Sequence, residues 1–258
     1  MSADADATAK ALLAAHHARD TFTRIGPPGA DLAFAYAVQA RYVALLAAER
    51  GAPVAGYKIG LTTPKMQAMV GLDQPIAGSV LADRIHHGPT TFAAARYGRL
   101  GIECEIALRI GRPHDGPGDT ASRESAAAMI DGAAAAFEVI DDRNADYGTL
   151  EVVSLVADNS WNEGLVLGPV QPLPDLAGLE GVLRVNGAVV DRGRSDDVLG
   201  HPLNAIAWLV RFLAARGDAL RPGQWVTTGS IIATRFPDVG DRYAFSVGDL
   251  PAAELTVA

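Results

Sequence analysis

The sequence predicts an α+β protein whose core consists mainly of β-strands, with a few helices beside them. The first indication is the frequency of turn-forming residues, because 27 glycines and 15 prolines divide the 258 residues into short segments. The second is that several of these segments alternate apolar and polar residues, as strands with one buried face do. Single strands do not alternate regularly with helices, so repeated β-α-β units are not expected.

Helical spacing of apolar residues predicts three helices. Apolar residues recur every three to four positions from Leu32 to Ala47, and Asp31 directly before them is a suitable N-cap. A second helix is expected near residues 122–136. A third helix is expected to begin at Pro202 and to end at Gly217. We therefore expect a small helical N-terminal region over residues 1–52 and a larger β-rich domain over residues 53–258.

A two-residue period predicts the strands. Asn186 and Gly187 lie between two alternating runs, and this pair favours the tight type I′ turn of a β-hairpin. The alternating segments are residues 101–110, 183–190, 225–228, 243–247 and 254–257.

Charge and cysteine content exclude several classes of protein. Twenty-two lysines and arginines against 30 aspartates and glutamates give a net charge of −8 and a pI near 5.2, which disfavours nucleic acid and anionic membranes as partners. Cys104 is the only cysteine, so the chain has no internal disulfide. The first residues do not resemble a signal peptide, and no apolar run approaches the ~18 residues of a membrane span. We expect a cytoplasmic protein whose ligand is a small molecule or a metal ion.

Common nucleotide-binding and hydrolase motifs are absent from the sequence. It contains no G-x-G-x-x-G, no P-loop, no H-E-x-x-H and no G-x-S-x-G. Dinucleotide binding, nucleoside triphosphate binding, zincin chemistry and a nucleophile-elbow hydrolase are therefore not predicted.

Two glutamates on one predicted strand are the first candidates for chemistry. Glu103 and Glu105 share one face of the strand 101–110 and lie ~6.6 Å apart along it, so they repel each other unless a cation or solvent compensates. Glu138 adds a third acid within an apolar run, and buried acids usually have partners. Two interpretations are open: a solvated edge of a sheet, or a site for a hard divalent metal such as Mg²⁺ or Mn²⁺.

Five segments together resemble the 2-oxopent-4-enoate hydratase and 4-oxalocrotonate decarboxylase family of the fumarylacetoacetase superfamily. The likeness extends from residues 35–39 to the last predicted strand, so it covers most of the chain. The segments are 57–62 (Tyr-Lys-Ile-Gly-Leu-Thr), 103–105 (Glu-Cys-Glu), Glu138 followed by Arg143, 157–160 (Ala-Asp-Asn-Ser) and 200–205 (Gly-His-Pro-Leu-Asn-Ala).

The resemblance implies a mixed β-roll as the catalytic domain, of the fumarylacetoacetase C-terminal type, and assembly into homo-oligomers. It implies that Mg²⁺ or Mn²⁺ binds to Glu103, Glu105 and Glu138. Lys58 would contact the substrate oxygens or move a proton, and Ser160 would lie near the substrate.

The implied reaction is a metal-dependent hydration, which adds water to a 2-hydroxy-2,4-dienoate to give a 4-hydroxy-2-oxo acid in aromatic catabolism. Decarboxylation of a 4-oxalocrotonate-type 2-oxo acid is the alternative, and hydrolysis of an acylpyruvate carbon–carbon bond is a third reading. A catalytically silent protein that binds a dicarboxylate is a fourth.

One departure from the family pattern bears on this choice. Several hydratases of the family carry an acid after the Gln-Pro pair, whereas here Asp73-Gln74-Pro75 is followed by Ile76. Asp73 is then the candidate for activating water. The segment 160–164 is also bulkier and more polar than the family pattern suggests.

Other polar residues receive less specific predictions. His201 is expected to cap the third helix, and the pairs His16-His17 and His86-His87 are expected at the surface. The candidates for binding a substrate carboxylate are Arg99, Arg109 and Arg143.

Overall fold

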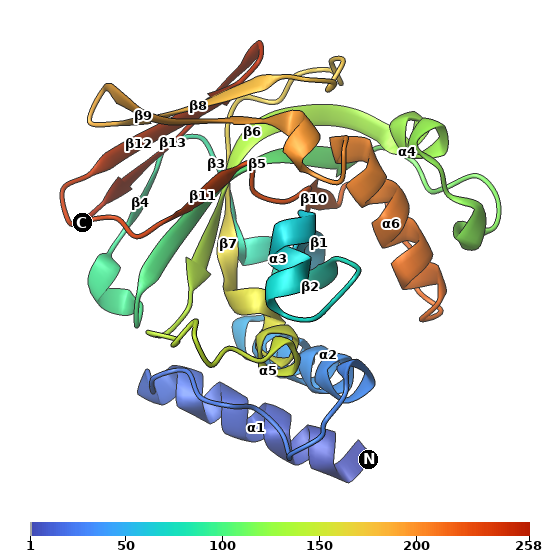
Figure 1. Ribbon diagram of the computed structural model, residues 1–258, viewed down its shortest axis with the longest axis vertical. Coiled ribbons are helices and arrows are strands. Elements are labelled where there is room, and N and C mark those ends of the chain that lie inside the picture. The colour runs from blue at the N-terminus through green and yellow to red at the C-terminus, as the bar shows by residue number, and fades with distance from the viewer. Residues whose placement is uncertain (1) are drawn as a thin grey trace.

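The computed structural model describes residues 2–258 and confirms an α+β fold (Figure 1). Met1, where the predicted helical region begins, lies outside the described residues. The helices are α1 (Ser2–Ala18), α2 (Leu32–Arg50), α3 (Pro64–Met69), α4 (Arg123–Met129), α5 (Val152–Ala157) and α6 (Pro202–Ala214).

Two mixed sheets form the β-rich core. The 8-stranded sheet has the order β2-β1-β10-β5-β6-β7-β3, and β11 also pairs with β5. Most neighbours are antiparallel, but β1 with β10 and β3 with β7 are parallel. Its strands are β1 (Val54–Gly60), β2 (Ile76–Leu81), β3 (Ile85–His87), β5 (Leu100–Ile110), β6 (Ile130–Asp141), β7 (Asn162–Leu167), β10 (Trp225–Thr227) and β11 (Ile232–Arg235).

The second sheet has 5 strands in the order β4-β13-β12-β8-β9. Asn186 and Gly187 both have positive φ, 52° and 85°, and join β8 to β9 in the predicted hairpin. The strands are β4 (Thr90–Phe92), β8 (Glu180–Val185), β9 (Ala188–Arg194), β12 (Arg242–Val247) and β13 (Leu250–Val257).

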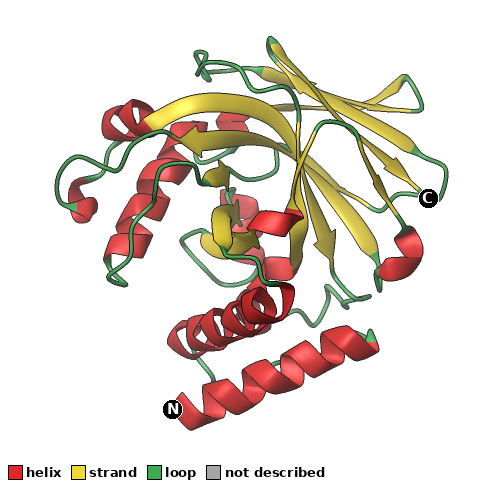
Figure 2. Cartoon of the chain, turned by 180° about the vertical axis from the view of Figure 1, so that it is seen from behind, coloured by secondary structure: helices red, strands yellow, loops and turns green. Residues whose placement is uncertain are grey.

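The curved strands β5 and β6 run through the middle of the molecule (Figure 2). Ile102, Cys104 and Ile106 on one face of β5 belong to the main hydrophobic core, together with residues of β12, β13 and α6. The other face of β5 carries Glu103 and Glu105, as the alternation predicts.

The predicted helix over residues 122–136 is correct only for its first half. Ser122 caps α4, which ends at Met129, and β6 begins at Ile130. Ala133 and Phe137 therefore belong to a strand. Because β6 lies between β5 and β7 and is buried on both faces, its sequence shows no two-residue period.

The other two predicted helices are confirmed. Asp31 caps α2 by accepting a hydrogen bond from the N–H of Phe34 (2.8 Å). His201 caps α6 by accepting one from the N–H of Leu203 (3.1 Å), directly before Pro202. α1 and α2 pack together at the bottom of Figure 1. α5 packs against α2 on the side that faces the larger sheet.

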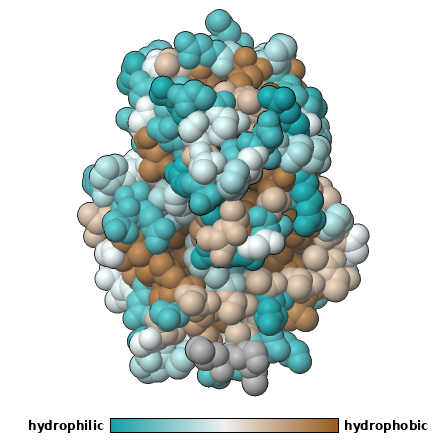
Figure 3. All heavy atoms as spheres, turned by 90° about the vertical axis from the view of Figure 1, so that its right-hand side faces the viewer, coloured by the Kyte–Doolittle hydropathy of each residue, from teal (hydrophilic) through white to brown (hydrophobic). Residues whose placement is uncertain are grey.

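The surface of the side that carries α6 mixes hydrophilic residues with apolar patches (Figure 3). Within residues 2–258, no helix combines the length and the apolar character that crossing a bilayer requires.

Candidate active site and metal centre

The three glutamates singled out in the sequence come together on one face of the larger sheet. β5 and β6 are antiparallel neighbours whose register places Glu103 directly opposite Glu138. Glu105 lies two residues further along β5 and therefore projects from the same face. One carboxylate oxygen from each of the three lies within 4.8 Å of the others.

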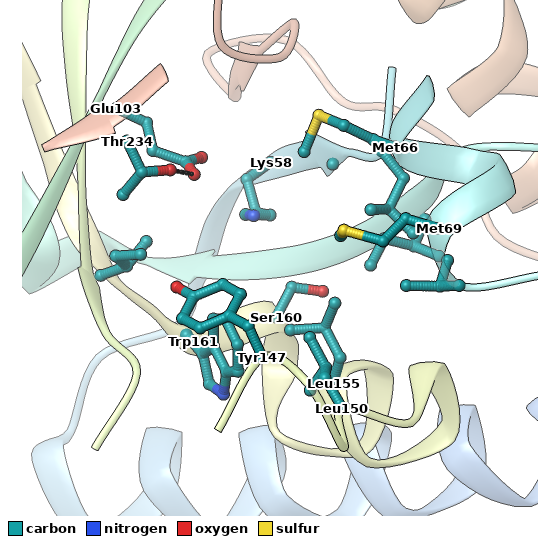
Figure 4. Close-up of a pocket in the computed structure, with 15 residues that line it drawn as sticks. Lys58, Met66, Met69, Glu103, Tyr147, Leu150, Leu155, Ser160, Trp161 and Thr234 are labelled. Atoms are coloured by element: carbon teal, nitrogen blue, oxygen red, sulfur yellow. Dashed lines mark hydrogen bonds between the residues drawn. The ribbon is translucent and has the colours of Figure 1, made fainter. Parts of the chain in front are cut away.

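Lys58 reaches this cluster from β1. Its Nζ atom lies 3.3 Å from Oε1 of Glu138, and the residue is only 4% exposed. Figure 4 shows its side chain extending into the middle of a cavity, with Glu103 to one side. The Lys58 ammonium is therefore buried against the glutamates and does not extend to bulk solvent.

Neighbouring segments hold the glutamates through hydrogen bonds. Two of the partners lie more than 120 residues from their glutamates, and the third begins the neighbouring strand β7. The backbone N–H of Gly229 donates to Glu105 (2.7 Å), the side-chain amide of Asn162 donates to Glu138 (2.8 Å), and the hydroxyl of Thr234 donates to Glu103 (2.6 Å).

Burial and mutual repulsion dominate the electrostatics of the cluster. Burial, with repulsion from Glu138 and Glu103, raises the pKa of Glu105 well above its ordinary value. Burial also raises the pKa of Glu138, although Lys58 opposes this shift. Burial alone would lower the pKa of Lys58, but the three glutamates together raise it. Three carboxylates against one ammonium, 3 − 1, leave two uncompensated negative charges when all groups are ionised.

The cluster fits a divalent metal ion. Glu105 and Glu138 are completely buried (0% exposed), yet Oε1 of Glu105 and Oε2 of Glu138 have no hydrogen-bond partner. A buried carboxylate oxygen without a partner is costly unless a cation compensates for it. Carboxylate oxygens are the ligands that Mg²⁺ and Mn²⁺ prefer in proteins. The three glutamates are thus the residues that could hold such an ion.

A cavity opens beside the cluster. Glu103 and Lys58 line its polar side, together with Thr234. Ser160 and Ile76, both singled out in the sequence, line it as well.

Ser160 lies in an unusual left-handed turn. Asn159, Ser160 and Trp161 have φ values of 49°, 51° and 62°, a conformation that residues other than glycine rarely adopt in succession. The Ser160 hydroxyl is buried without a hydrogen-bond partner, and it lines the cavity. Strain and an unpaired buried group at one residue are typical of functional sites.

Two anchors hold this turn in place. The Asn159 side chain accepts a hydrogen bond from the backbone N–H of Ser79 (2.7 Å) and donates one to the backbone carbonyl oxygen of Ser79 (2.8 Å). It thus pairs with both backbone groups of β2 at this position, as the backbone of a neighbouring strand would. The buried carboxylate of Asp158 contacts Nε2 of His16 and Nη2 of Arg143, each at 2.6 Å. His16 is therefore not the surface residue that the sequence predicts, because it connects α1 to the loop that carries Ser160.

Asp73 is not brought to the cavity. It is exposed, and it is not among the lining residues in the described part of the chain. Ile76, three residues later, is buried in the cavity wall. A role for Asp73 in activating water stays a prediction.

The three arginines considered for a substrate carboxylate each have another partner. Arg99 pairs with Asp142, Arg109 with Asp131 and Arg143 with Asp158.

Several contributors to the site carry no signal in the sequence. Thr234 and Gly229 lie more than 120 residues from the glutamates that they contact, and nothing in their local pattern indicates this. Tyr147, which lines the cavity, is likewise part of an irregular loop. Asn162 does carry a signal in the sequence, because it belongs to the unusually polar segment 160–164.

The chain resembles known proteins over most of its length. Residues 73–258 match the family described as fumarylacetoacetate (FAA) hydrolase C-terminal. The chain is 34% identical over 224 residues to a 2-oxo-hept-4-ene-1,7-dioate hydratase of Escherichia coli, covering 84% of this chain and 83% of the relative. It is 35% identical over 235 residues to a 2-keto-4-pentenoate hydratase of Burkholderia vietnamiensis, covering 89% of this chain and 87% of the relative.

A solved structure resembles the whole chain. The 4-oxalocrotonate decarboxylase from Pseudomonas putida G7, complexed with magnesium and adipate, superposes with a TM-score of 0.91 at 28% sequence identity. The match covers 100% of this chain and 98% of the decarboxylase. The chain therefore belongs to the fumarylacetoacetate hydrolase family, within the group of 2-keto-4-pentenoate hydratases and 4-oxalocrotonate decarboxylases.

Proposed function

We propose that this protein is a metal-dependent hydratase that adds water to a 2-hydroxy-2,4-dienoate and forms a 4-hydroxy-2-oxo acid in aromatic catabolism. The observation that carries this proposal is the cluster of Glu103, Glu105 and Glu138, in which the two fully buried members each have an unpartnered oxygen. The ammonium of Lys58 lies against this cluster, 3.3 Å from Glu138. The names of the relatives that match over most of the chain support the same class of reaction.

Glu103, Glu105 and Glu138 would hold the ion, which we propose is Mg²⁺ or Mn²⁺. When bound, a divalent ion supplies a Lewis acid that favours the enolate form of a 2-oxo acid. The chain's own residues then orient the substrate and move protons.

Lys58 would carry out the proton transfers. This assignment is supported by its side chain, which lines the same cavity as Glu103. In the first step the enol O–H bond breaks and a C–H bond forms at C5, which gives an unsaturated 2-oxo acid. Water then adds its hydroxyl to C4 and a proton to C3. A positioned acid of this kind typically contributes about 10²- to 10⁴-fold to the rate.

Ser160 would contribute a hydrogen bond to the substrate, since its buried hydroxyl has no protein partner and faces the same cavity. Asp73 stays a candidate for the attacking water on sequence grounds alone. The carboxylate that lines the cavity is Glu103. We further propose that the protein is cytoplasmic, acts on a small 2-oxo acid and assembles into a homo-oligomer.

Ultraviolet absorbance of 2-hydroxypenta-2,4-dienoate tests the proposal. Purified protein with Mg²⁺ should remove the diene absorbance and form 4-hydroxy-2-oxopentanoate, and a chelator should stop the reaction. Loss of the diene without that product, or a rate unaffected by the chelator, contradicts the proposal.

A decarboxylase is the second candidate, and Ile76 favours it. This apolar residue lines the cavity where some hydratases of the family carry an acid, and it cannot activate water. Release of carbon dioxide from 2-oxohex-3-enedioate, faster than hydration of any dienoate, would establish this alternative.

A further inference from the structure

The cavity has a polar end and an apolar end, on opposite sides of Lys58. Glu103 and Thr234 lie on one side of the lysine, and the side chains of Met66 and Met69 lie on the other (Figure 4). Leu150 and Leu155 approach the methionines from the loop before α5 and from α5 itself. A substrate whose 2-oxo acid end lies beside Glu103 therefore directs its other end toward this apolar wall.

The methionines of this wall are exposed although they are apolar. Met66 is 36% exposed and Met69 is 61% exposed, and α3, which carries both, has no buried residue. An exposed apolar surface that continues into a cavity is typical of a binding site. Methionine suits this use because its flexible thioether adapts to ligands of different shape.

Cationic groups are absent from the apolar end. Within residues 2–258, Lys58 is the only lysine or arginine that lines the cavity, and Glu138 already contacts it at 3.3 Å. The nearby Arg99 and Arg143 are paired with aspartates. A carboxylate at the apolar end would exchange part of its hydration for contact with methionine and leucine side chains and would gain no counter-charge, which is unfavourable.

We propose that the apolar end selects substrates with an uncharged tail: 2-hydroxydienoates with a single carboxylate and an alkyl or aryl group at the far end of the diene. Substrates with a second carboxylate at that end are disfavoured. This inference rests on the proposed hydratase function and names the substrate class of the same site.

An adjoining hollow offers the other direction for a substrate tail. Glu103, Met66 and Thr234 border both spaces. Lys65 lines this hollow, but so do Asp196 and Asp197. Its lining sets Glu103, Asp196 and Asp197 against Lys65, and Arg194 lies 3.8 Å from Asp196, so the hollow offers a further carboxylate no unshared cation.

Three substrates test the proposal on the wild-type protein with Mg²⁺. 2-Hydroxyhepta-2,4-diene-1,7-dioate carries the second carboxylate, and 2-hydroxy-7-methylocta-2,4-dienoate replaces it by an uncharged isopropyl group of similar size. 2-Hydroxypenta-2,4-dienoate is the reference without a tail. We expect kcat/KM for the isopropyl compound to equal or exceed that of the reference, and to exceed that of the dioate about tenfold or more.

The outcomes separate this inference from the proposed function. If no compound is hydrated, the hydratase proposal fails. If all are hydrated but the dioate is as good as its isopropyl counterpart or better, the hydratase proposal holds and the inference is wrong. A preference for the dioate that disappears in Lys65→Ala would show that the tail occupies the adjoining hollow, which also overturns the inference.

Substitutions at Met69 provide a second test, because this exposed side chain tolerates replacement without loss of the core. Met69→Arg should raise kcat/KM for the dioate about tenfold and lower it for the isopropyl compound, since it supplies the missing counter-charge. Met69→Gln is the matched control for polarity without charge and should not improve the dioate. Equal effects of both substitutions on the two substrates would contradict the assignment of the apolar end.

Discussion

Glu105 and Glu138 are buried carboxylates without enough protein counter-charge, and this imbalance defines the site at the residue scale. Both have an unpartnered oxygen, and one lysine serves three glutamates. Such an arrangement is unfavourable in isolation and becomes favourable when a cation binds. The spacing of Glu103 and Glu105 on one strand predicts part of this arrangement. The opposition of Glu103 and Glu138 depends on strand register, which the sequence does not reveal.

Glu103→Gln tests the glutamate cluster. Removal of one ligand charge should weaken Mg²⁺ or Mn²⁺ binding at least tenfold and reduce turnover in parallel, because the same ion serves both. Isothermal titration calorimetry and the diene assay measure the two quantities. The control is Glu254→Gln, on the exposed side of β13, which should leave both unchanged. Full turnover by Glu103→Gln would show that the site is placed wrongly.

Lys58→Met separates proton transfer from metal binding. The substitution keeps the length and apolar stem of the side chain but removes the ammonium, so kcat should fall about 10²- to 10⁴-fold. Metal affinity should persist, since all three glutamates remain. Lys65→Met, at an exposed lysine of α3, is the control and should retain wild-type turnover of the reference diene. A Lys58→Met protein with unchanged kcat rules out a catalytic role for this lysine.

At the scale of single elements, β6 and the turn at Ser160 show where prediction from sequence succeeds and fails. Strands whose sequence alternates apolar and polar residues, such as β5, and helices with distinct caps such as Asp31 and His201 are predicted correctly. β6 is not, because small apolar residues buried on both of its faces fit a helix equally well. The strained turn at Ser160 is held by the contact of Asp158 with His16 of α1. These two residues are more than 100 positions apart in the sequence, so no local pattern reveals the contact.

His16→Ala tests the anchoring of that turn by α1. The imidazole lies 2.6 Å from the buried carboxylate of Asp158, so its loss should lower the free energy of unfolding by about 1–3 kcal/mol. It should also reduce kcat more than the neighbouring substitution His17→Ala, because the Ser160 turn loses one of its supports. Urea denaturation and steady-state kinetics provide the measurements.

His17→Ala is the matched control, since His17 contacts Glu49 at 3.0 Å with both side chains about half exposed. Surface pairs of this kind contribute ~0–1 kcal/mol. Equal stability and equal kcat in the two variants would mean that α1 does not position the active site.

At the scale of the whole molecule, the family resemblance and the composition predict the architecture, whereas the patterns of single segments predict only individual helices and strands. The α+β class, the mixed sheets and the family are confirmed. The boundary between residues 1–52 and 53–258 stays a prediction. α1 and α2 share a hydrophobic cluster with Ile76, Leu155 and Trp161, so the helical region packs directly against the walls of the cavity.

Metal binding should stabilise the whole fold. An ion that binds the native state alone adds RT ln(1 + [L]/Kd) to the free energy of unfolding, or about 2.7 kcal/mol at a hundredfold excess over Kd. Mg²⁺ should therefore raise Tm of metal-free protein, and a chelator should reverse the effect. The same titration on Glu103→Gln should shift Tm much less; an equal shift in both proteins places the ion elsewhere.

The most direct test of the active-site assignment is a parallel titration of metal-free protein with Mn²⁺, in which bound metal and hydration of 2-hydroxypenta-2,4-dienoate are measured on the same samples. We predict one tightly bound ion per chain and a rate that rises in proportion to its occupancy. Undiminished hydration by protein shown to contain no metal would contradict the assignment, as would a rate that stays at zero when the site is full.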